Sequence, residues 1–409
     1  MKDVKVTALR RVALTSVGLV VLLAAAACGS SAAGGSGSSS FAVGASFNPA
    51  SVTVVPGPFV NQKDYETEIA EMQATPQGPS DAPWEQMIDP QMVSTTQYAK
   101  PAPWHVCFSN AGVTNNPWRV VGLTTMEQQV KLEPQIGTFT VADAQFDDNN
   151  QISDIQQLLN ENCNLLIVSA NTTDALTPEV EAACATGIPV ITFDRGVNTD
   201  CPVSFVSPIG GYAFGAAGAT FIAQHVKAGG NVVIVKDTPG VDVLEQRDAA
   251  ARAIFKAAGL HVVGDAYTNL DNAQTKTFID DTIEKYGHID GVFMDAGAAG
   301  VAVINAFQEA KKPVPVISGE DENDFLEDVV NDHLTGVAPV NSNFEWRTVI
   351  IDAVDVLSGT SVPKDWVDPQ TTILPSQMSK YANSTLPPKF YAMCGCQGMP
   401  NFPQAWMNS

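Results

Sequence analysis

Short apolar runs alternate with longer amphipathic segments between Trp104 and about residue 332. This alternation is typical of βαβ units, in which helices connect parallel strands and cover the sheet. It occurs in two successive series, so we predict an α/β protein with two similar Rossmann-like lobes. The expected strands are 105–109, 137–142, 164–169 and 188–193, then 231–235, 261–265, 290–294 and 314–318. The expected helices are 117–131, 151–162 and 175–186, then 210–228, 243–258, 273–286, 297–311 and 323–332.

Neither series contains a G-x-G-x-x-G or G-x-x-x-x-G-K-[ST] pattern, the glycine-rich loops that hold dinucleotides and nucleotide phosphates. The five histidines are scattered, and Cys394-Gly-Cys396 lacks the second pair of ligands that a zinc site needs. We therefore expect no cofactor and no metal. The formal net charge of −22 repels phosphate backbones, which argues against nucleic acid as a partner.

The first residues have the layout of an export signal. A basic start precedes the apolar run Val12–Ala27, which ends in small residues before Cys28. The segment resembles a bacterial lipoprotein signal, although Ala25 stands where such signals usually carry Leu. The resemblance implies a signal peptide over 1–27, a lipid on Cys28 and a flexible Gly/Ser tether over 28–40. Plain secretion is the alternative.

Six cysteines follow Cys28, and an even number outside the cytoplasm predicts disulfides. We expect a short Cys394–Cys396 bridge and a Cys184–Cys201 bridge across the loop after a strand, which leaves Cys107 with Cys163. Free buried thiols are the alternative.

Two flanking segments carry no recognisable chemistry. Residues 41–103 contain nine prolines and a short helix near Tyr65–Gln73, and are expected to form a stalk or a strap over the globule. Residues 375–409 form a C-terminal tail.

The run from Ile188 to Arg195 is the most informative motif. Its apolar strand ends directly in Asp194 and Arg195. Strand carboxyl ends face the ligand crevice of an open parallel sheet. A carboxylate acceptor beside a planar guanidinium donor suits a ligand with several vicinal hydroxyls. A surface salt bridge after a strand is the alternative.

Four motifs in order carry a family resemblance: Asn115-Asn116-Pro117-Trp118, the run Ile188–Arg195, Gly240 to Arg247, and Gly319-Glu320-Asp321. Residues 104–374 resemble the periplasmic binding protein superfamily, closest to the ribose-binding-like sugar proteins that serve ABC importers. The resemblance implies the type I fold, with two lobes joined by a three-strand hinge near 206–209, 339–343 and 362–370. Lobe 1 would comprise 104–207 and 342–365, and lobe 2 would comprise 208–341 and 366–374.

The same resemblance implies ligand roles. Asn116, Asp194 and Arg195 would bind hydroxyls and Trp118 would stack on the sugar, while Arg247 and Asp321 act from the other lobe and Asn341 from the hinge. Asp295 is an additional carboxylate beside Ala296, where the family has a ribose-binding Asn, and it favours a more hydroxylated sugar or a polyol. Alternatively Asp295 caps the following helix. Arg119 and Glu320 are expected to be solvent-exposed.

The expected function is an extracytoplasmic, lipid-anchored, monomeric binding component of an ABC importer, with a membrane permease as partner and no catalysis. A sensor module that presents its ligand to a membrane receptor is an alternative. A glycoside hydrolase with Asp194 and Asp321 as the carboxylate pair is a weaker one, because Arg195 and Arg247 would keep both carboxylates ionised.

Overall fold

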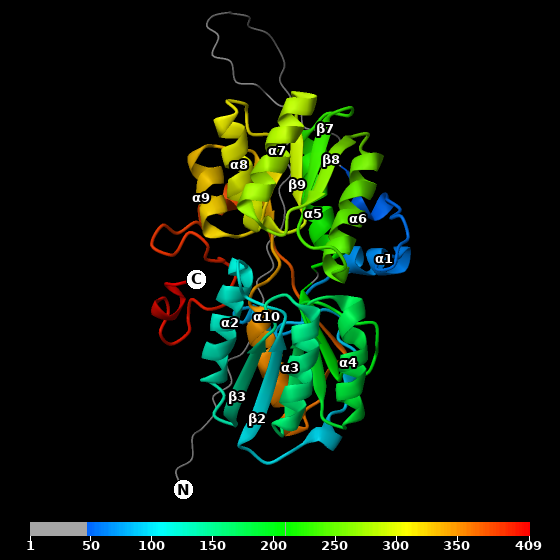
Figure 1. Cartoon of the computed structure of the whole chain (residues 1–409), viewed down its shortest axis with the longest axis vertical. Coiled ribbons are helices and arrows are strands. Elements are labelled where there is room, and N and C mark those ends of the chain that lie inside the picture. The colour runs from blue at the N-terminus through cyan, green and yellow to red at the C-terminus, as the bar shows by residue number, and fades with distance from the viewer. Residues whose placement is uncertain (1–46, 209) are drawn as a thin grey trace, which may run out of the picture. The chain divides into compact units, whose positions relative to one another are not determined.

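The computed structural model describes residues 47–208 and 210–409. The expected signal peptide, Cys28 and the tether lie outside the described residues. The described part contains two six-stranded sheets, and each is the centre of one lobe. Figure 1 shows the first half of the chain largely in one lobe and the yellow-green part in the other.

The sheet of lobe 1 is entirely parallel and has the order β13-β6-β5-β4-β2-β3. Its strands are β2 Trp104–Asn110, β3 Ile136–Asp143, β4 Leu165–Ser169, β5 Val190–Phe193, β6 Ser204–Pro208 and β13 Asp365–Asp368. Its helices are α2 Pro117–Val130, α3 Asp148–Asn160, α4 Thr173–Ala185 and α10 Glu345–Ser358.

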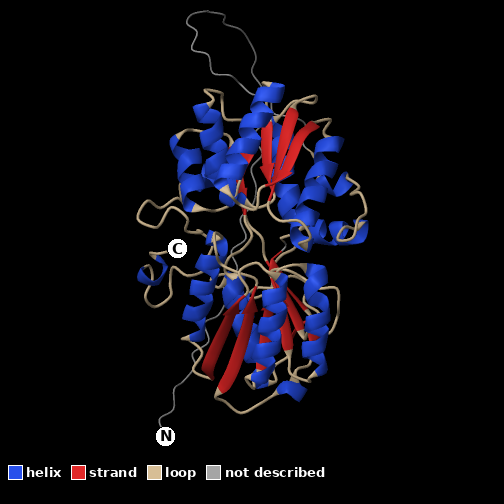
Figure 2. Ribbon diagram, viewed as in Figure 1, coloured by secondary structure: helices blue, strands red, loops and turns tan. Residues whose placement is uncertain are grey.

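Both faces of this sheet are buried, which explains why its strands are apolar runs. Along β2, Val106 and Phe108 pack on the side of α2 and α10, whereas Cys107 packs on the side of α3 and α4. Phe108 and Phe193 both lie edge-on to the indole of Trp346 in α10. Helices accordingly cover the sheet from two sides (Figure 2).

The sheet of lobe 2 has the order β14-β11-β10-β9-β7-β8, parallel except for β14. Its strands are β7 Asn231–Lys236, β8 His261–Tyr267, β9 Gly291–Met294, β10 Val316–Ser318, β11 Gly336–Pro339 and β14 Thr372–Ile373. Its helices are α5 Tyr212–His225, α6 Asp242–Ala257, α7 Asn272–Tyr286, α8 Gly300–Glu309, α9 Asn323–Asn331 and α11 Pro375–Met378.

The structure confirms the predicted fold class, and each of the eight expected strands overlaps an observed one. The sequence did not predict β6 and β11. Both end in proline, and the chain then crosses to the other lobe. The prediction depended on each strand being followed by a helix of the same lobe. This does not hold after β6 and β11.

The chain passes between the lobes after β6, after β11 and after β13. The third crossing corrects the expected boundary at residue 365. Strand β13 pairs with β6 in the first sheet, and Trp366 is buried in the core of lobe 1. Residues 366–368 therefore belong to lobe 1, and the crossing lies at 369–371.

The N-terminal extension is a strap that packs on both lobes. Its helix α1, Gln62–Glu71, lies against lobe 2, where the buried ring of Tyr65 meets Tyr212 edge-on at 5.5 Å between centroids. Further along, β1 (Met92–Val93) pairs with β12 (Val362–Pro363) on lobe 1. Five apolar residues of the extension, Val52, Val54, Val60, Tyr65 and Ile69, are thus part of the core of lobe 2, and the stalk interpretation is wrong.

Three disulfides form among the described residues, and they join the expected pairs: Cys107–Cys163, Cys184–Cys201 and Cys394–Cys396. The prediction of the pairing is confirmed. In the part of the chain that the structure describes, no helix has the length and apolar character needed to cross a membrane.

Tyr65→Ala tests whether the extension stabilises lobe 2. The substitution removes a fully buried aromatic side chain, and we expect it to lower the free energy of unfolding by about 3–5 kcal/mol. Lys63→Ala, on the exposed face of α1, is the control and should change this free energy by less than about 0.5 kcal/mol. Urea denaturation followed by circular dichroism measures both. Equal midpoints for the two variants would contradict the assignment.

Candidate ligand-binding cleft

A cleft lies where the carboxyl ends of strands from the two lobes meet. It contains about 450 Å³ of empty space, part of which is open to solvent. Open α/β sheets bind ligands at this edge, because polar loop residues gather there beyond the apolar strands. Lobe 1 contributes Asn116, Trp118, Arg119, Asp194 and Arg195, and lobe 2 contributes Asp237, Val243, Leu244, Arg247, Leu270, Ala296, Ala298 and Glu320. Asn341 of the hinge and Tyr391 of the tail complete the lining.

Six of the eight residues predicted to bind ligand line this cleft, and two do not. The two are Asp295 and Asp321. A contact between any of the eight and a ligand remains a prediction.

Asp194 is held by a buried ion pair that the sequence analysis did not expect. Its Oδ2 accepts from Nη1 of Arg119 at 2.6 Å, and both side chains are nearly inaccessible. Nη2 of Arg119 also donates to Oδ1 of Asn110 and to Oγ of Ser169, each at 2.7 Å. One guanidinium therefore ties together the ends of β2, β4 and β5. Asp194 adopts φ +64°, a left-handed conformation that Asp tolerates better than most residues.

The expectation that Arg119 is exposed was wrong, since its side chain is 1% accessible. Burial lowers the pKa of Arg119 to about 10, while the neighbouring Asp194 raises it, so the guanidinium stays charged at neutral pH. A signal was present in the sequence. Arg119 lies in the first turn of α2, where a cation opposes the helix dipole and needs a compensating carboxylate.

The two other arginines of the cleft are each fixed by backbone carbonyls. Nη1 of Arg195 donates to the carbonyl of Asn171 at 2.8 Å. Arg247 donates from Nε to the carbonyl of Gly210 and from Nη1 to the carbonyl of Asp295. Within the described part of the chain, Nη2 of neither side chain has a hydrogen-bond partner. The backbone carbonyls thus set the orientation of both guanidinium groups.

Asp237 is a cleft residue that the sequence analysis missed. It directly follows β7, is 6% exposed and accepts from Oγ1 of Thr238 at 3.0 Å. Burial raises the pKa of Asp237, and the charges of Arg195 and Arg247 oppose this rise. The signal that identified Asp194, a carboxylate immediately after an apolar strand, applies equally to Asp237.

Asp295 lies beneath the cleft lining. Its Oδ1 accepts from the backbone N–H of Asp237 at 2.8 Å, and its carbonyl accepts from Arg247. Burial raises the pKa of Asp295 well above its ordinary value, and the charge of Asp237 adds to the rise. Asp295 therefore positions two lining residues. The capping alternative is wrong, because Ala296 occupies the cap position of the short 3₁₀ helix Gly297–Ala299.

Glu320 lines the cleft and Asp321 does not, which is the reverse of what the sequence predicted. Asp321 faces away from the cleft, where its Oδ2 accepts from the backbone N–H of Met393 at 2.6 Å. Burial raises the pKa of Asp321 to about 7. Glu320, expected in solvent, lines the cleft, is 4% exposed and lies 3.7 Å from Arg247. Consecutive residues of an extended chain point to opposite sides, so a ligand role for one disfavours it for the other.

Asn116, Trp118 and Asn341 form one corner of the cleft. Oδ1 of Asn116 caps α2 by accepting from the N–H of Arg119, and Nε1 of Trp118 donates to the carbonyl of Asn341 at 3.0 Å. Oδ1 of Asn341 is buried and has no hydrogen-bond partner among the described residues. Buried polar atoms are normally satisfied, so this oxygen is a candidate acceptor for a ligand hydroxyl.

The formal charges that line the cleft balance. Arg119, Arg195 and Arg247 face three carboxylates, those of Asp194, Asp237 and Glu320. A charge added to this site would be left without a counter-charge in a desolvated space, which is unfavourable. The cleft therefore suits a neutral guest.

Comparison with known proteins gives a consistent result. A family model described as periplasmic binding protein domain matches residues 106–359. The ribose import binding protein of Bacillus subtilis is 24% identical over 250 residues, which is 61% of this chain and 81% of that protein. The xylitol-binding protein of Mycolicibacterium smegmatis is 24% identical over 222 residues, 54% of this chain and 63% of that protein.

Solved structures share the fold. An ABC transporter solute-binding protein from Bacillus halodurans with bound myo-inositol has a TM-score of 0.63 and 20% identity, covering 69% of this chain and 98% of that one. The fructose-binding periplasmic domain of a hybrid two-component system has a TM-score of 0.62 and 21% identity, covering 68% and 92%.

Asp194→Ala should destabilise the ligand-free protein, because it leaves the guanidinium of Arg119 buried without its carboxylate. We expect a loss of about 3–5 kcal/mol in the free energy of unfolding. Arg119→Met and the double variant complete a double-mutant cycle measured by urea denaturation. The double variant should lose less than the sum of the two single losses. Additive losses would contradict the ion pair.

Proposed function

The chain belongs to the periplasmic binding protein domain family, and we propose that it is the extracytoplasmic component of an ABC importer that binds a neutral sugar or polyol. The observation that carries this proposal is the arrangement of opposed acid–guanidinium groups in one cleft. Asp194 and Arg195 come from lobe 1, and Asp237 and Arg247 come from lobe 2. One chain supplies both sides, so we propose that the protein binds as a monomer.

The chemistry of these groups suits vicinal hydroxyls. A carboxylate accepts from two neighbouring hydroxyls, and a guanidinium donates to the same edge of the ligand. The apolar side chains of Leu244 and Leu270 and the ring of Trp118 offer surface for the C–H faces of a sugar or polyol. Closure of the two lobes on the ligand is the hinge motion that such proteins use. A ligand that lacks one hydroxyl leaves a buried group unpaired, and this gives selectivity.

The charge balance favours neutral ligands over sugar acids and sugar phosphates. The myo-inositol and xylitol in the names of two similar proteins are neutral polyols and support this choice. A hydrolase is disfavoured, because Asp321 is not among the residues that line the cleft and the carboxylate of Asp194 is bound to Arg119, so the two do not flank one bond of a ligand.

A sensor function is a second candidate, favoured by the likeness to the fructose-binding domain of a two-component system. Deletion of the gene separates the two functions. Loss of uptake of the bound ligand supports transport, whereas normal uptake with loss of the transcriptional response supports sensing.

Asp237→Asn tests the cleft assignment. A thermal-shift screen of pentoses, hexoses, sugar alcohols, cyclitols and sugar acids should find stabilisation of the wild-type protein by neutral compounds only. The substitution keeps the shape but removes a charged acceptor, so binding should weaken by about 1.5–3 kcal/mol, or roughly 10- to 150-fold in Kd. Glu284→Gln, on the exposed face of α7, is the control and should bind normally. Normal binding by Asp237→Asn would remove Asp237 from the site.

We also propose that a lipid on Cys28 anchors the protein to the outer face of the cell membrane, near its permease. The support is the basic start, the apolar run and the cysteine of the export signal. Cys28→Ser should move the protein from the membrane fraction to the soluble extracytoplasmic fraction, detected by immunoblotting after fractionation. Retention of the variant in the membrane fraction would argue against the anchor.

A further inference from the structure

The C-terminal tail is bonded along the end of lobe 2. The backbone N–H of Asn323 donates to the carbonyl of Phe390 at 2.8 Å, and the N–H of Met393 donates to the carboxylate of Asp321 at 2.6 Å. Asp321 is fully buried, and a buried carboxylate needs donors. The tail supplies one, the N–H of Met393, while Oδ1 of Asp321 has no hydrogen-bond partner among the described residues. Residues 390–393 are therefore fixed at the edge of the cleft.

Tyr391 extends from this fixed stretch into the cleft lining. Its side chain is fully buried, and its hydroxyl donates to Oε2 of Glu320 at 3.2 Å. Oε1 of Glu320 lies 3.7 Å from Nη1 of Arg247. Burial raises the pKa of Tyr391 well above its ordinary value, so the hydroxyl keeps its proton and remains a donor. Tyr391 thus sets the direction of a carboxylate that faces the cleft.

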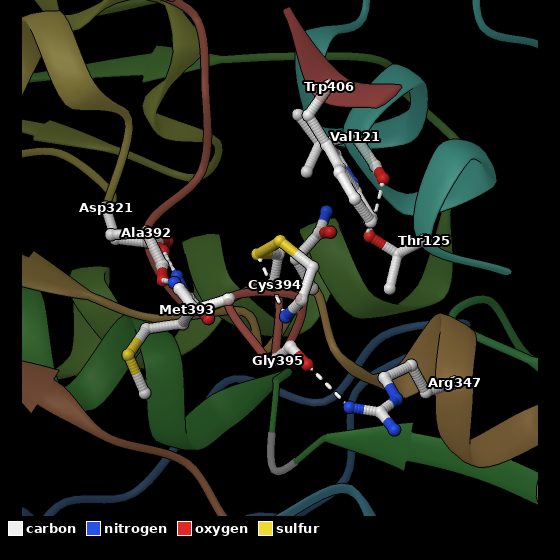
Figure 3. The surroundings of a disulfide bond; sticks show 12 residues. Val121, Thr125, Asp321, Arg347, Ala392, Met393, Cys394, Gly395 and Trp406 are labelled. Atoms are coloured by element: carbon white, nitrogen blue, oxygen red, sulfur yellow. Dashed lines mark hydrogen bonds between the residues drawn. A yellow bond between two sulfur atoms is a disulfide. The ribbon is translucent and has the colours of Figure 1, made fainter. Parts of the chain in front are cut away.

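Phe390, Tyr391 and the turn that follows them also anchor the tail on lobe 1, because all belong to its core. The Cys394–Cys396 turn is buried in the core of lobe 1, and the carbonyl of Gly395 accepts from Nη1 of Arg347 at 2.6 Å. Figure 3 shows this turn between Arg347 and Trp406, with Met393 and Asp321 on the other side. Nε1 of Trp406 donates to Oγ1 of Thr125 in α2 at 3.0 Å. The stretch from Tyr391 to Cys396 thus contacts both lobes.

We propose that Tyr391 is a specificity-determining residue of the ligand site and that the Cys394–Cys396 turn holds it there. This inference rests on the proposed function, and it adds a third group of side chains to the two acid–guanidinium pairs. Neither the expected family roles nor the motifs of the sequence include the tail, because the resemblance ends near residue 374.

The pair of Tyr391 and Glu320 selects a ligand that has one hydroxyl more than the two acid–guanidinium pairs can bind. With Oε2 accepting from Tyr391 and Oε1 beside Arg247, Glu320 presents its remaining lone pairs in a fixed direction. A ligand hydroxyl that donates there gives this buried carboxylate a further hydrogen bond, which a ligand lacking the hydroxyl cannot make. The site therefore favours hexitols, cyclitols and hexoses over smaller polyols.

The test compares ligands by isothermal titration calorimetry. The probes are xylitol, sorbitol, myo-inositol, D-ribose and D-fructose, each with its monodeoxy analogues. In the wild-type protein, the strongest ligand should bind about 10- to 150-fold more tightly than the monodeoxy analogue that lacks the selected hydroxyl. Tyr391→Phe keeps the ring but loses the donor, and this ratio should fall by about tenfold. Tyr381→Phe, in the same tail but outside the cleft lining, should leave the ratio unchanged.

Cys394→Ser with Cys396→Ser tests the role of the turn. The double variant keeps Tyr391 but lacks the disulfide that holds the turn beside it, so the affinity ratio between the ligand and its monodeoxy analogue should fall. Loss of the Cys184–Cys201 bridge should leave this ratio unchanged. If Tyr391 has a merely structural role, Tyr391→Phe weakens the binding of all ligands equally, and the ratio of the two affinities does not change. That result would overturn this inference but leave the proposed function standing. A wild-type protein that binds no probe overturns the proposed function and the inference with it.

Discussion

The buried ion pair between Arg119 and Asp194 is the interaction on which lobe 1 of the cleft depends. A guanidinium without access to water must find acceptors for its donors, and Arg119 finds them at the ends of three strands. These bonds fix the relative positions of the strand ends and hold Asp194 in a left-handed conformation. Removal of the carboxylate would therefore disturb the edge of the sheet as well as the binding of a ligand.

Lobe 2 achieves the same preorganisation by a different route. Arg247 is held by two backbone carbonyls, and Asp237 is positioned by the carboxylate of Asp295 behind it. Burial raises the pKa of Asp237, Asp295 and Glu320, so these acids are unfavourable as bare charges and require donors. A polyhydroxylated ligand provides such donors without adding charge. The electrostatics of the cleft thus support the proposed class of ligand, a neutral sugar or polyol.

The sequence predicted those parts of the molecule whose structure follows from a local pattern of apolar and polar residues. The strand-then-helix alternation located eight strands, and the rule that ligands bind at strand ends located Asp194 and Arg195. The same rule applied to β7 would have found Asp237. The orientations of Asp295 and Asp321 could not be predicted, because a shift of one residue in an extended chain turns a side chain to the other side. Tyr391 lies in a tail without periodicity, so its position depends entirely on tertiary contacts.

The tail and the N-terminal strap also constrain how the lobes can move. The strap packs α1 on lobe 2 and β1 on lobe 1. The tail contacts lobe 2 through the bond of Tyr391 to Glu320, and it packs on lobe 1 through the ring of Tyr391 and through Cys394. Only two residues separate these last anchors, and three peptide steps span at most roughly 10–11 Å. The lobes therefore cannot separate far at the point where the tail crosses without detaching one anchor. Under the proposed hinge motion, opening is then greatest at the part of the cleft remote from the tail, where the contact of Tyr391 with Glu320 does not restrain the lobes.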